Sequence, residues 1–351
     1  MKLTFPMSQI PRSHSEPNFV NPRFRTLWML ADLTDNDRYR LSSDDYARAT
    51  EILSRLEVQG VSGQDVAYLY RLGIDLSSYT PFHQDYRGVD MSQLRLKGVK
   101  LSGPRLEESH WQGSVLTDCE FRSLNAEHAD FGGTKFVRVR LDPAVPFHIS
   151  SGSMVKTSNF LEAAFHEVQA KFVEFHECDF SGAQLEGSDF RHTTWQQNQF
   201  ANAKITNSDF SGARFFASRP WHGAEVSNCV FDHAQLRRIP WGFGFFEGCS
   251  FRGANLRGAN LGCSEFTRAK FEGADLSDAD LEGAVFPNAM FDGARLQGMK
   301  GRGGYFADSS FKGSQLRGAD FRDANLRGCD FRGCDLRGVN FTGAQMDDCL
   351  F

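Results

Sequence analysis

The sequence predicts a mainly β protein, a square solenoid built from five-residue sides and preceded by a small α-helical region. Three observations predict this fold class. From Val226 to Phe351 every fifth residue is apolar except Gly301. Two places before most of these central residues stands a small residue, usually alanine. Of the 33 phenylalanines in the chain, 24 fall on central positions of this repeat or of its less regular N-terminal stretches.

A period of five fits neither a helix, with about 3.6 residues per turn, nor a flat strand, with a period of about two. It fits a chain that turns a corner every five residues and points one large and one small side chain inward on each side. Four such sides close a coil, and successive coils stack by backbone hydrogen bonds about 4.8 Å apart. Glycines recur two places after the centre, as at Gly253 and Gly258, where a tight corner needs unusual dihedral angles.

Repeats in the C-terminal half resemble the A-(D/N)-(L/F)-x-x unit of pentapeptide-repeat proteins, for example Ala254-Asn255-Leu256-Arg257-Gly258 and Ala319-Asp320-Phe321-Arg322-Asp323. The resemblance covers about residues 86–351 and implies a right-handed quadrilateral β-helix. The central positions, 49 in three frames, correspond to about 12 coils and a rod about 60 Å long.

The chain before the solenoid is different in kind. Residues 1–22 are polar and predict a disordered leader. Residues 23–85 predict a small helical region, with one helix over 43–60 and a second over 64–72. Packed on the first coil, these helices would cap its open apolar end. The last coil, which ends at Phe351, shows no such cap, so a second copy of the chain could dock there to form a homodimer.

Within the solenoid, residues 86–351, the repeat breaks near 142–154, 216–225 and 237–245, where loops are expected to leave the wall. The last two breaks contain Pro-Trp pairs 20 residues apart, which is one coil, so the pairs should lie above one another. We interpret them as a candidate partner-binding patch of aromatic and basic side chains. Its candidate residues are Arg219, Pro220, Trp221, Arg238, Pro240, Trp241, Phe243 and Phe245. The alternative is that the tryptophans only fill a distorted rung.

A second candidate surface is basic. Lys312 and five arginines occupy consecutive positions just after the centre, and we call these arginines the arginine collar. They are Arg317, Arg322, Arg327, Arg332 and Arg337. The collar could dock an acidic partner. Alternatively, Asp320, Asp330 and Asp335, which stand just before centres, could bind these arginines in cross-coil salt bridges on a solvated face.

Composition and charge argue against several function classes. The chain has 39 basic and 44 acidic residues, a net charge of −5 that is spread evenly, so no direct nucleic-acid binding is expected. No apolar run approaches the ~20 residues of a membrane span. The inward positions are apolar and the interior is filled, so we predict no catalytic residues, no metal, no cofactor and no enzymatic activity. Seven of the eight cysteines take the small inward position and are expected to be reduced, packed thiols.

These observations favour a protein that binds other proteins. The first hypothesis is a non-enzymatic protein–protein interaction scaffold in the bacterial cytoplasm, or a bacterial effector delivered into a host cell, with a partner that the sequence does not identify. The family resemblance also implies an alternative, binding to DNA gyrase or another topoisomerase as in the quinolone-protection proteins. A third alternative is a structural spacer.

Overall fold

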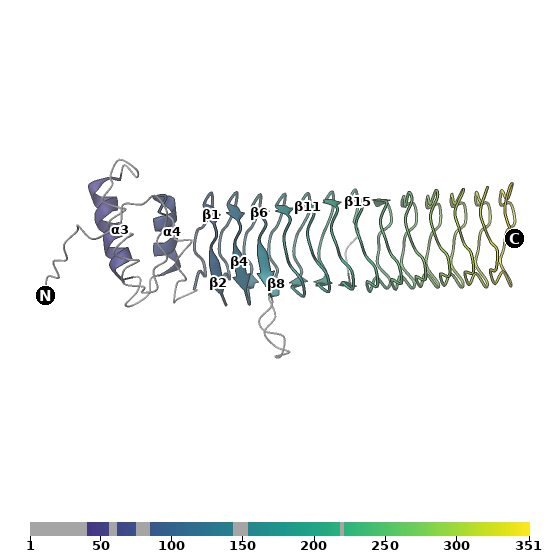
Figure 1. The fold of residues 1–351 in the computed structure, drawn as a ribbon, viewed down its shortest axis with the longest axis horizontal. Helices are drawn as coiled ribbons and strands as arrows, with labels where there is room; N and C mark the ends of the chain where they lie inside the picture. Colours follow the sequence, from purple (N-terminus) through teal and green to yellow (C-terminus); the bar gives the residue numbers. More distant parts are fainter. Residues whose placement is uncertain (1–40, 56–61, 75–84, 143–153, 218–220) are drawn as a thin grey trace, which may run out of the picture.

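A computed structural model describes residues 41–55, 62–74, 85–142, 154–217 and 221–351. Two helices, α3 (Ser43–Arg55) and α4 (Gly63–Arg71), are followed by a long stack of coils (Figure 1). The first helix was expected over 43–60, and its predicted end lies outside the described residues. The predicted leader over 1–22 and most of the loop predicted near 142–154 also lie outside them. No described helix is long and apolar enough to cross a membrane.

The wall of the solenoid is built from three-residue strands that pair only in parallel. The longest sheet contains β1 (Arg95–Lys97), β3 (Val115–Thr117), β6 (Lys135–Val137), β9 (Ala164–His166), β11 (Gln184–Glu186), β13 (Lys204–Thr206), β15 (Glu225–Ser227) and β16 (Phe245–Glu247). A second sheet contains β5 (Asn125–Glu127), β8 (Met154–Lys156), β10 (Glu174–His176), β12 (Thr194–Gln196) and β14 (Arg214–Phe216). The third contains β2 (Lys100–Ser102), β4 (Glu120–Arg122) and β7 (Arg140–Asp142).

These sheets form three sides of a square, which we call the β1, β5 and β2 sides. Single parallel bridges form the fourth side, which begins at Asp90, and they also continue the other three ladders toward Leu350. Because the β5 and β1 sides lie about ten residues apart along each coil, they face in opposite directions. The quadrilateral β-helix that the five-residue period predicts is therefore confirmed.

The register between coils shows where the chain leaves the wall. Most paired residues are 20 apart, but Asn125 pairs with Met154, so nine extra residues enter at the predicted break near 142–154. Lys204 pairs with Glu225, which places one extra residue at the break after Phe215. The structure differs from the prediction over 237–245, because Pro240 bridges Asn260 in normal register. Elsewhere the residue before the centre donates its N–H to the preceding coil, so a proline there loses only one ladder bond.

The interior is a set of stacked side chains that fills the tube. On the β2 side, consecutive phenylalanine rings from Phe231 to Phe331 stack with centroids 4.9 or 5.1 Å apart. Alanines in the small slot, such as Ala254 and Ala274, are almost completely buried beside them. The corner residue after each side takes a left-handed conformation, for example Gly273 at a φ of 67°. This alternation of one large and one small inward residue explains the five-residue period.

Helix α4 packs closely on the first coil. A β-carbon on Gly63 would lie 2.7 Å from the carbonyl oxygen of Asp85 and 2.9 Å from Cδ1 of Tyr86, so only glycine allows this approach. Ser62 caps the helix in a reciprocal capping box with Asp65. At the other end, Arg71 forms an ion pair of 2.9 Å with Asp90. Together these contacts hold the helical region against the open end of the tube.

Candidate functional site

The two tryptophans of the predicted patch lie inside the solenoid. Trp221 and Trp241 are both fully buried, and their ring centroids are 4.7 Å apart. The interpretation of these rings as a recognition surface is therefore wrong, and they fill the interior as the alternative stated. The reason is the register, because both residues occupy central, inward-pointing positions of the repeat. Arg219 and Pro220 lie outside the described residues, whereas Pro240 lies in the wall.

Two phenylalanines from the same prediction do reach solvent. Phe243 is 61% exposed and Phe245 is 53% exposed, so they are among the most exposed large apolar residues of the coils. Phe243 occupies the corner between the Asp90 side and the β1 side, and Phe245 begins β16 on the β1 side. We call Phe243 and Phe245 the aromatic corner. Arg238 occupies the preceding corner, at the opposite end of the Asp90 side, so the structure does not bring it together with them.

Phe243 takes the left-handed backbone conformation that the described corners of this coil share. Its φ is 65°, in the left-handed region, where glycine, asparagine and aspartate are the common residues and a bulky side chain is an outlier. Phe245 follows without such strain. Gly244 between them takes the small inward slot, and a β-carbon there would lie 2.6 Å from Cε2 of Phe246. The Gly-Phe-Gly-Phe sequence thus lets the wall continue while it presents two rings outward.

The surroundings of the aromatic corner are open. The ring of His222, on the coil before, lies 6.2 Å from the ring of Phe243 at an angle of 41°, which is a loose contact. Cys263 occupies the same corner on the next coil, also at positive φ, and its thiol is exposed. Together with the aromatic corner, His222 and Cys263 form a surface patch that can contact another apolar surface.

Phe172 is an exposed aromatic residue that the sequence analysis missed. It is 54% exposed and has a φ of 60°, so it resembles Phe243, but it lies at the opposite corner, three and a half coils nearer to the helices. Its ring stacks on His192 with centroids 5.1 Å apart and an angle of 9°. The signal that could have found both residues is a phenylalanine two places after a centre, where the repeat otherwise has glycine or another residue that is in most cases polar.

The arginine collar does not form one surface. Its first four arginines lie on four different sides of one coil, because each follows the centre of a new side. Three of the five bind the aspartate two residues earlier on the same side, and a fourth, Arg327, reaches Asp347 on the next coil at 2.9 Å. The three same-side pairs, each 2.6 Å long, are Arg322–Asp320, Arg332–Asp330 and Arg337–Asp335. Hydrogen bonds from Arg337 lower the pKa of Asp335 to about 2. Salt bridges are thus the better description, mostly within a coil rather than across coils.

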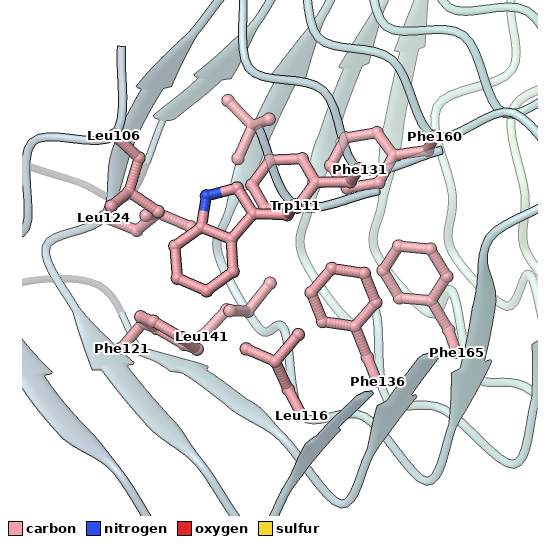
Figure 2. A pocket seen from close by; sticks show the side chains of 11 residues that line it. Leu106, Trp111, Leu116, Phe121, Leu124, Phe131, Phe136, Leu141, Phe160 and Phe165 are labelled. Atoms are coloured by element: carbon pink, nitrogen blue, oxygen red, sulfur yellow. The ribbon is translucent and has the colours of Figure 1, made fainter. Parts of the chain in front are cut away.

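The interior offers no reactive site in the described part of the chain. A cavity of about 20 Å³ lies among apolar side chains that point toward one another, including Leu116, Phe136 and Trp111 (Figure 2). The indole N–H of Trp111 donates to the hydroxyl of Ser109 at 2.8 Å. Burial raises the pKa of the Cys178 thiol to about 12, so this thiol stays protonated at neutral pH. No group of three potential metal ligands occurs among the described residues.

Comparison with known families agrees with this architecture. A family model described as "Pentapeptide repeats (8 copies)" matches residues 105–136, 178–215, 244–298 and 305–351, in part by overlapping segments. The chain belongs to the pentapeptide-repeat family, and its fold is the β-helix of that family. No curated protein matches the sequence.

Several solved structures are similar to this chain. The pentapeptide repeat protein HetL, from the cyanobacterium Nostoc sp. strain PCC 7120, is 18% identical, with 76% of this chain and 88% of HetL covered and a TM-score of 0.20. QnrB1, described as a plasmid-mediated fluoroquinolone resistance protein, is 19% identical over 72% of this chain and 92% of its own, with a TM-score of 0.18. A pentapeptide repeat protein of the Arabidopsis thaliana thylakoid lumen is 34% identical over 29% of this chain and 69% of its own, with a TM-score of 0.17.

Proposed function

We propose that this protein is a non-enzymatic scaffold that binds another protein through the aromatic corner, Phe243 and Phe245. The observation that carries the proposal is the pair of exposed rings, Phe243 at 61% and Phe245 at 53%, on one short segment, whereas the exposed ring of Phe172 stacks on His192. Phe243 has a positive φ, and a non-glycine residue in this conformation costs about 1–2 kcal/mol. A glycine would complete the same turn without that cost, so the fold itself does not require the ring.

The filled interior supports the same proposal. Because central phenylalanines and leucines occupy the tube, only the outer surface is available to a partner. Rigid aromatic rings on a β wall lose little conformational entropy on binding, and such rings commonly anchor protein interfaces. Phe243 and Phe245 come from one short segment, so a partner that covers this corner would bury both rings together.

The test is a comparison of matched glycine variants. Phe243→Gly should leave thermal stability within about 1 kcal/mol, because release of backbone strain offsets the loss of the partly buried ring. It should abolish cross-linking of the protein to its partner in bacterial extract. Phe172→Gly, which removes an exposed ring from another corner, should leave the same cross-link intact. Identical cross-linked proteins with all three chains would refute the proposal.

The identity of the cross-linked protein separates the remaining hypotheses. A host protein captured from host-cell extract by the wild type and lost in Phe243→Gly would support an effector delivered into host cells. Recovery of DNA gyrase would instead select the topoisomerase alternative, and a supercoiling assay with a quinolone present would check it directly. If the wild type captures nothing that the variant loses, the spacer alternative is favoured.

A further inference from the structure

We propose that two copies of this chain associate through their β1 sides, with the two rods antiparallel. The proposed contact shares Phe245 with the aromatic corner, whereas Phe243 lies at the corner outside this side. The β1 ladder has thirteen rungs, and its seventh is Glu225, at the midpoint. The rungs are Arg95, Val115, Lys135, Ala164, Gln184, Lys204, Glu225, Phe245, Glu265, Val285, Tyr305, Asn325 and Gln345. On each rung, the residue before the centre, the residue after it and the following corner residue point outward, except Ala307, which is buried.

The charge of this side reverses along its length. The first six rungs carry five basic residues, Arg95, Lys97, Lys135, Arg138 and Lys204, and three acidic ones, Asp118, Glu167 and Glu186, for a net charge of 5 − 3 = +2. The last seven rungs carry two basic residues, Arg268 and Arg327, for a net charge of 2 − 6 = −4. Their six acidic residues are Glu225, Glu247, Glu265, Asp308, Asp347 and Asp348. All of these side chains are exposed.

Ion pairs within the side sharpen this separation. Arg138 binds Asp118, Arg268 binds Glu247, and Arg327 binds Asp347. Four basic residues then have no carboxylate within ion-pair distance among the described residues, and all four lie in the first six rungs: Arg95, Lys97, Lys135 and Lys204. Six acidic residues have no Lys or Arg partner in the described chain: Glu225, Glu265, Asp308 and Asp348 lie in the last seven rungs, whereas Glu167 and Glu186 lie in the first six, next to His166. Parallel alignment of two such sides would place like charges together, whereas antiparallel alignment pairs opposite charges at the first three and last three rungs and between the sixth and eighth, with like carboxylates left at Glu225 and between Glu186 and Glu265.

Some residues of the β1 side find complementary partners in this arrangement, whereas Phe245 faces Lys204 of the second copy. In antiparallel register the first rung meets the last, the third meets the eleventh, and the fourth meets the tenth. Ala164 then faces Val285 of the second copy, and Lys97 faces its Asp347 and Asp348. Tyr305, which is 42% exposed, faces Lys135 of the second copy. The twofold axis runs along the strands at Glu225, where Lys204 on the neighbouring rung can reach the opposite carboxylate.

The size of the side is sufficient for a stable contact. Thirteen rungs at about 4.8 Å give a length of about 60 Å, and a side about 12 Å wide then buries about 700 Å² on each copy. This is close to the roughly 800 Å² per partner of a specific interface. A twofold contact of this kind uses the same surface on both copies and closes after two chains, so it predicts a dimer and not a filament.

The test measures association of the purified full chain by sedimentation equilibrium. Wild-type protein should form a dimer that weakens as salt rises from about 50 to about 500 mM, because the interface is electrostatic. Tyr305→Lys, which places a second cation against Lys135, should weaken the dimer at least tenfold. Phe216→Lys, on the opposite β5 side, is the matched control and should leave it unchanged. Phe243→Gly should also leave it unchanged, which separates failure of this inference from failure of the aromatic-corner proposal.

Charge exchange tests the antiparallel register. Lys97→Glu and Asp348→Lys should each weaken self-association about tenfold, since symmetry repeats each repulsive contact twice. An equimolar mixture of the two variants should form heterodimers with nearly wild-type affinity, because Glu at 97 then faces Lys at 348. A wild-type monomer at all concentrations, a dimer insensitive to Tyr305→Lys, or no recovery in the mixture would each overturn the inference. End-to-end docking through the last coil would give a dimer that ignores Tyr305→Lys and Lys97→Glu, which lie away from that coil.

Discussion

Replacement of Gly63 by alanine tests how the helical region is held on the solenoid. Helix propensity alone predicts that Gly63→Ala stabilises α4 by about 0.5–1 kcal/mol. The packing predicts the opposite, because the new methyl group would lie 2.7 Å from the Asp85 carbonyl oxygen, 2.9 Å from Tyr86 Cδ1 and 3.0 Å from Val89 Cγ2. Ordinary contacts are about 3.5–4.0 Å, so the helix must move by about 0.5–1 Å. Overpacking of this kind costs about 1–3 kcal/mol. After the gain in helix propensity is subtracted, Gly63→Ala should weaken the docking of α4 on the first coil by about 1–2 kcal/mol.

Hydrogen exchange of the α4 amides measures this weakening directly. Protection of α4 in Gly63→Ala should fall about 5- to 30-fold, while protection of the central coils stays unchanged. Gln64→Ala is the control, because Gln64 is exposed on the same helical turn and its replacement changes propensity without a clash. An increase of α4 protection in Gly63→Ala, of the size seen in Gln64→Ala, would refute the close-packing argument.

Three further predictions concern the core and the acid stability of the solenoid. The indole N–H of Trp241 is buried without a hydrogen-bond partner among the described residues, whereas that of Trp195 donates to a threonine hydroxyl at 2.7 Å. Trp241→Phe should therefore cost at least about 1 kcal/mol less free energy of unfolding than Trp195→Phe in chemical denaturation, and equal costs would contradict the assignment. Phe271→Ala should lower the free energy of unfolding by about 3–5 kcal/mol, because Phe271 is fully buried between stacked rings, and a loss below about 1 kcal/mol would show that the tube is not tightly packed. The pKa of Asp335 is lowered to about 2 by Arg337, so this pair stabilises the fold above the ordinary aspartate pKa of about 3.9 and the contribution is lost as pH falls toward about 2. Arg337→Gln should shift the acid unfolding midpoint to higher pH, and an unchanged midpoint would show that solvent screens this exposed pair completely.

The five-residue period predicted the fold because it reports directly which side chains point inward. The same period already contained the correct position of Trp241, which stands on a central position of the repeat. The prediction of a loop over 237–245 rested on a change of local composition, although the five-residue frame continues through this segment. A proline can remain in this wall because each side makes few ladder bonds and the loss of one is tolerated. Frame continuity is thus a better guide to burial in this chain than residue type.

The outer surface was harder to predict, for a physical reason. The repeat determines that Arg322 and Asp320 both point outward on the same side, but only their side-chain geometry determines that they pair with each other at 2.6 Å. Cross-coil and same-side partners are about equally distant from an extended arginine, and both are solvated, so their free energies differ little. A sequence therefore predicts a charged face much better than it predicts the ion pairs on that face.

In a solenoid, a change at one surface has little effect on the stability of distant coils, so the proposals for this protein can be tested separately. Each coil contacts only its neighbours, so a change at an exposed position on one coil alters the stability of about three coils and leaves distant ones unaffected. Gly63 acts at the first coil, Phe243 at the eighth rung and Lys97 at one end of the β1 side. A variant that abolishes one of these contacts and leaves the other two unchanged would show that the substituted surface itself makes the contact. Simultaneous loss of all of them would show that the rod itself had unfolded.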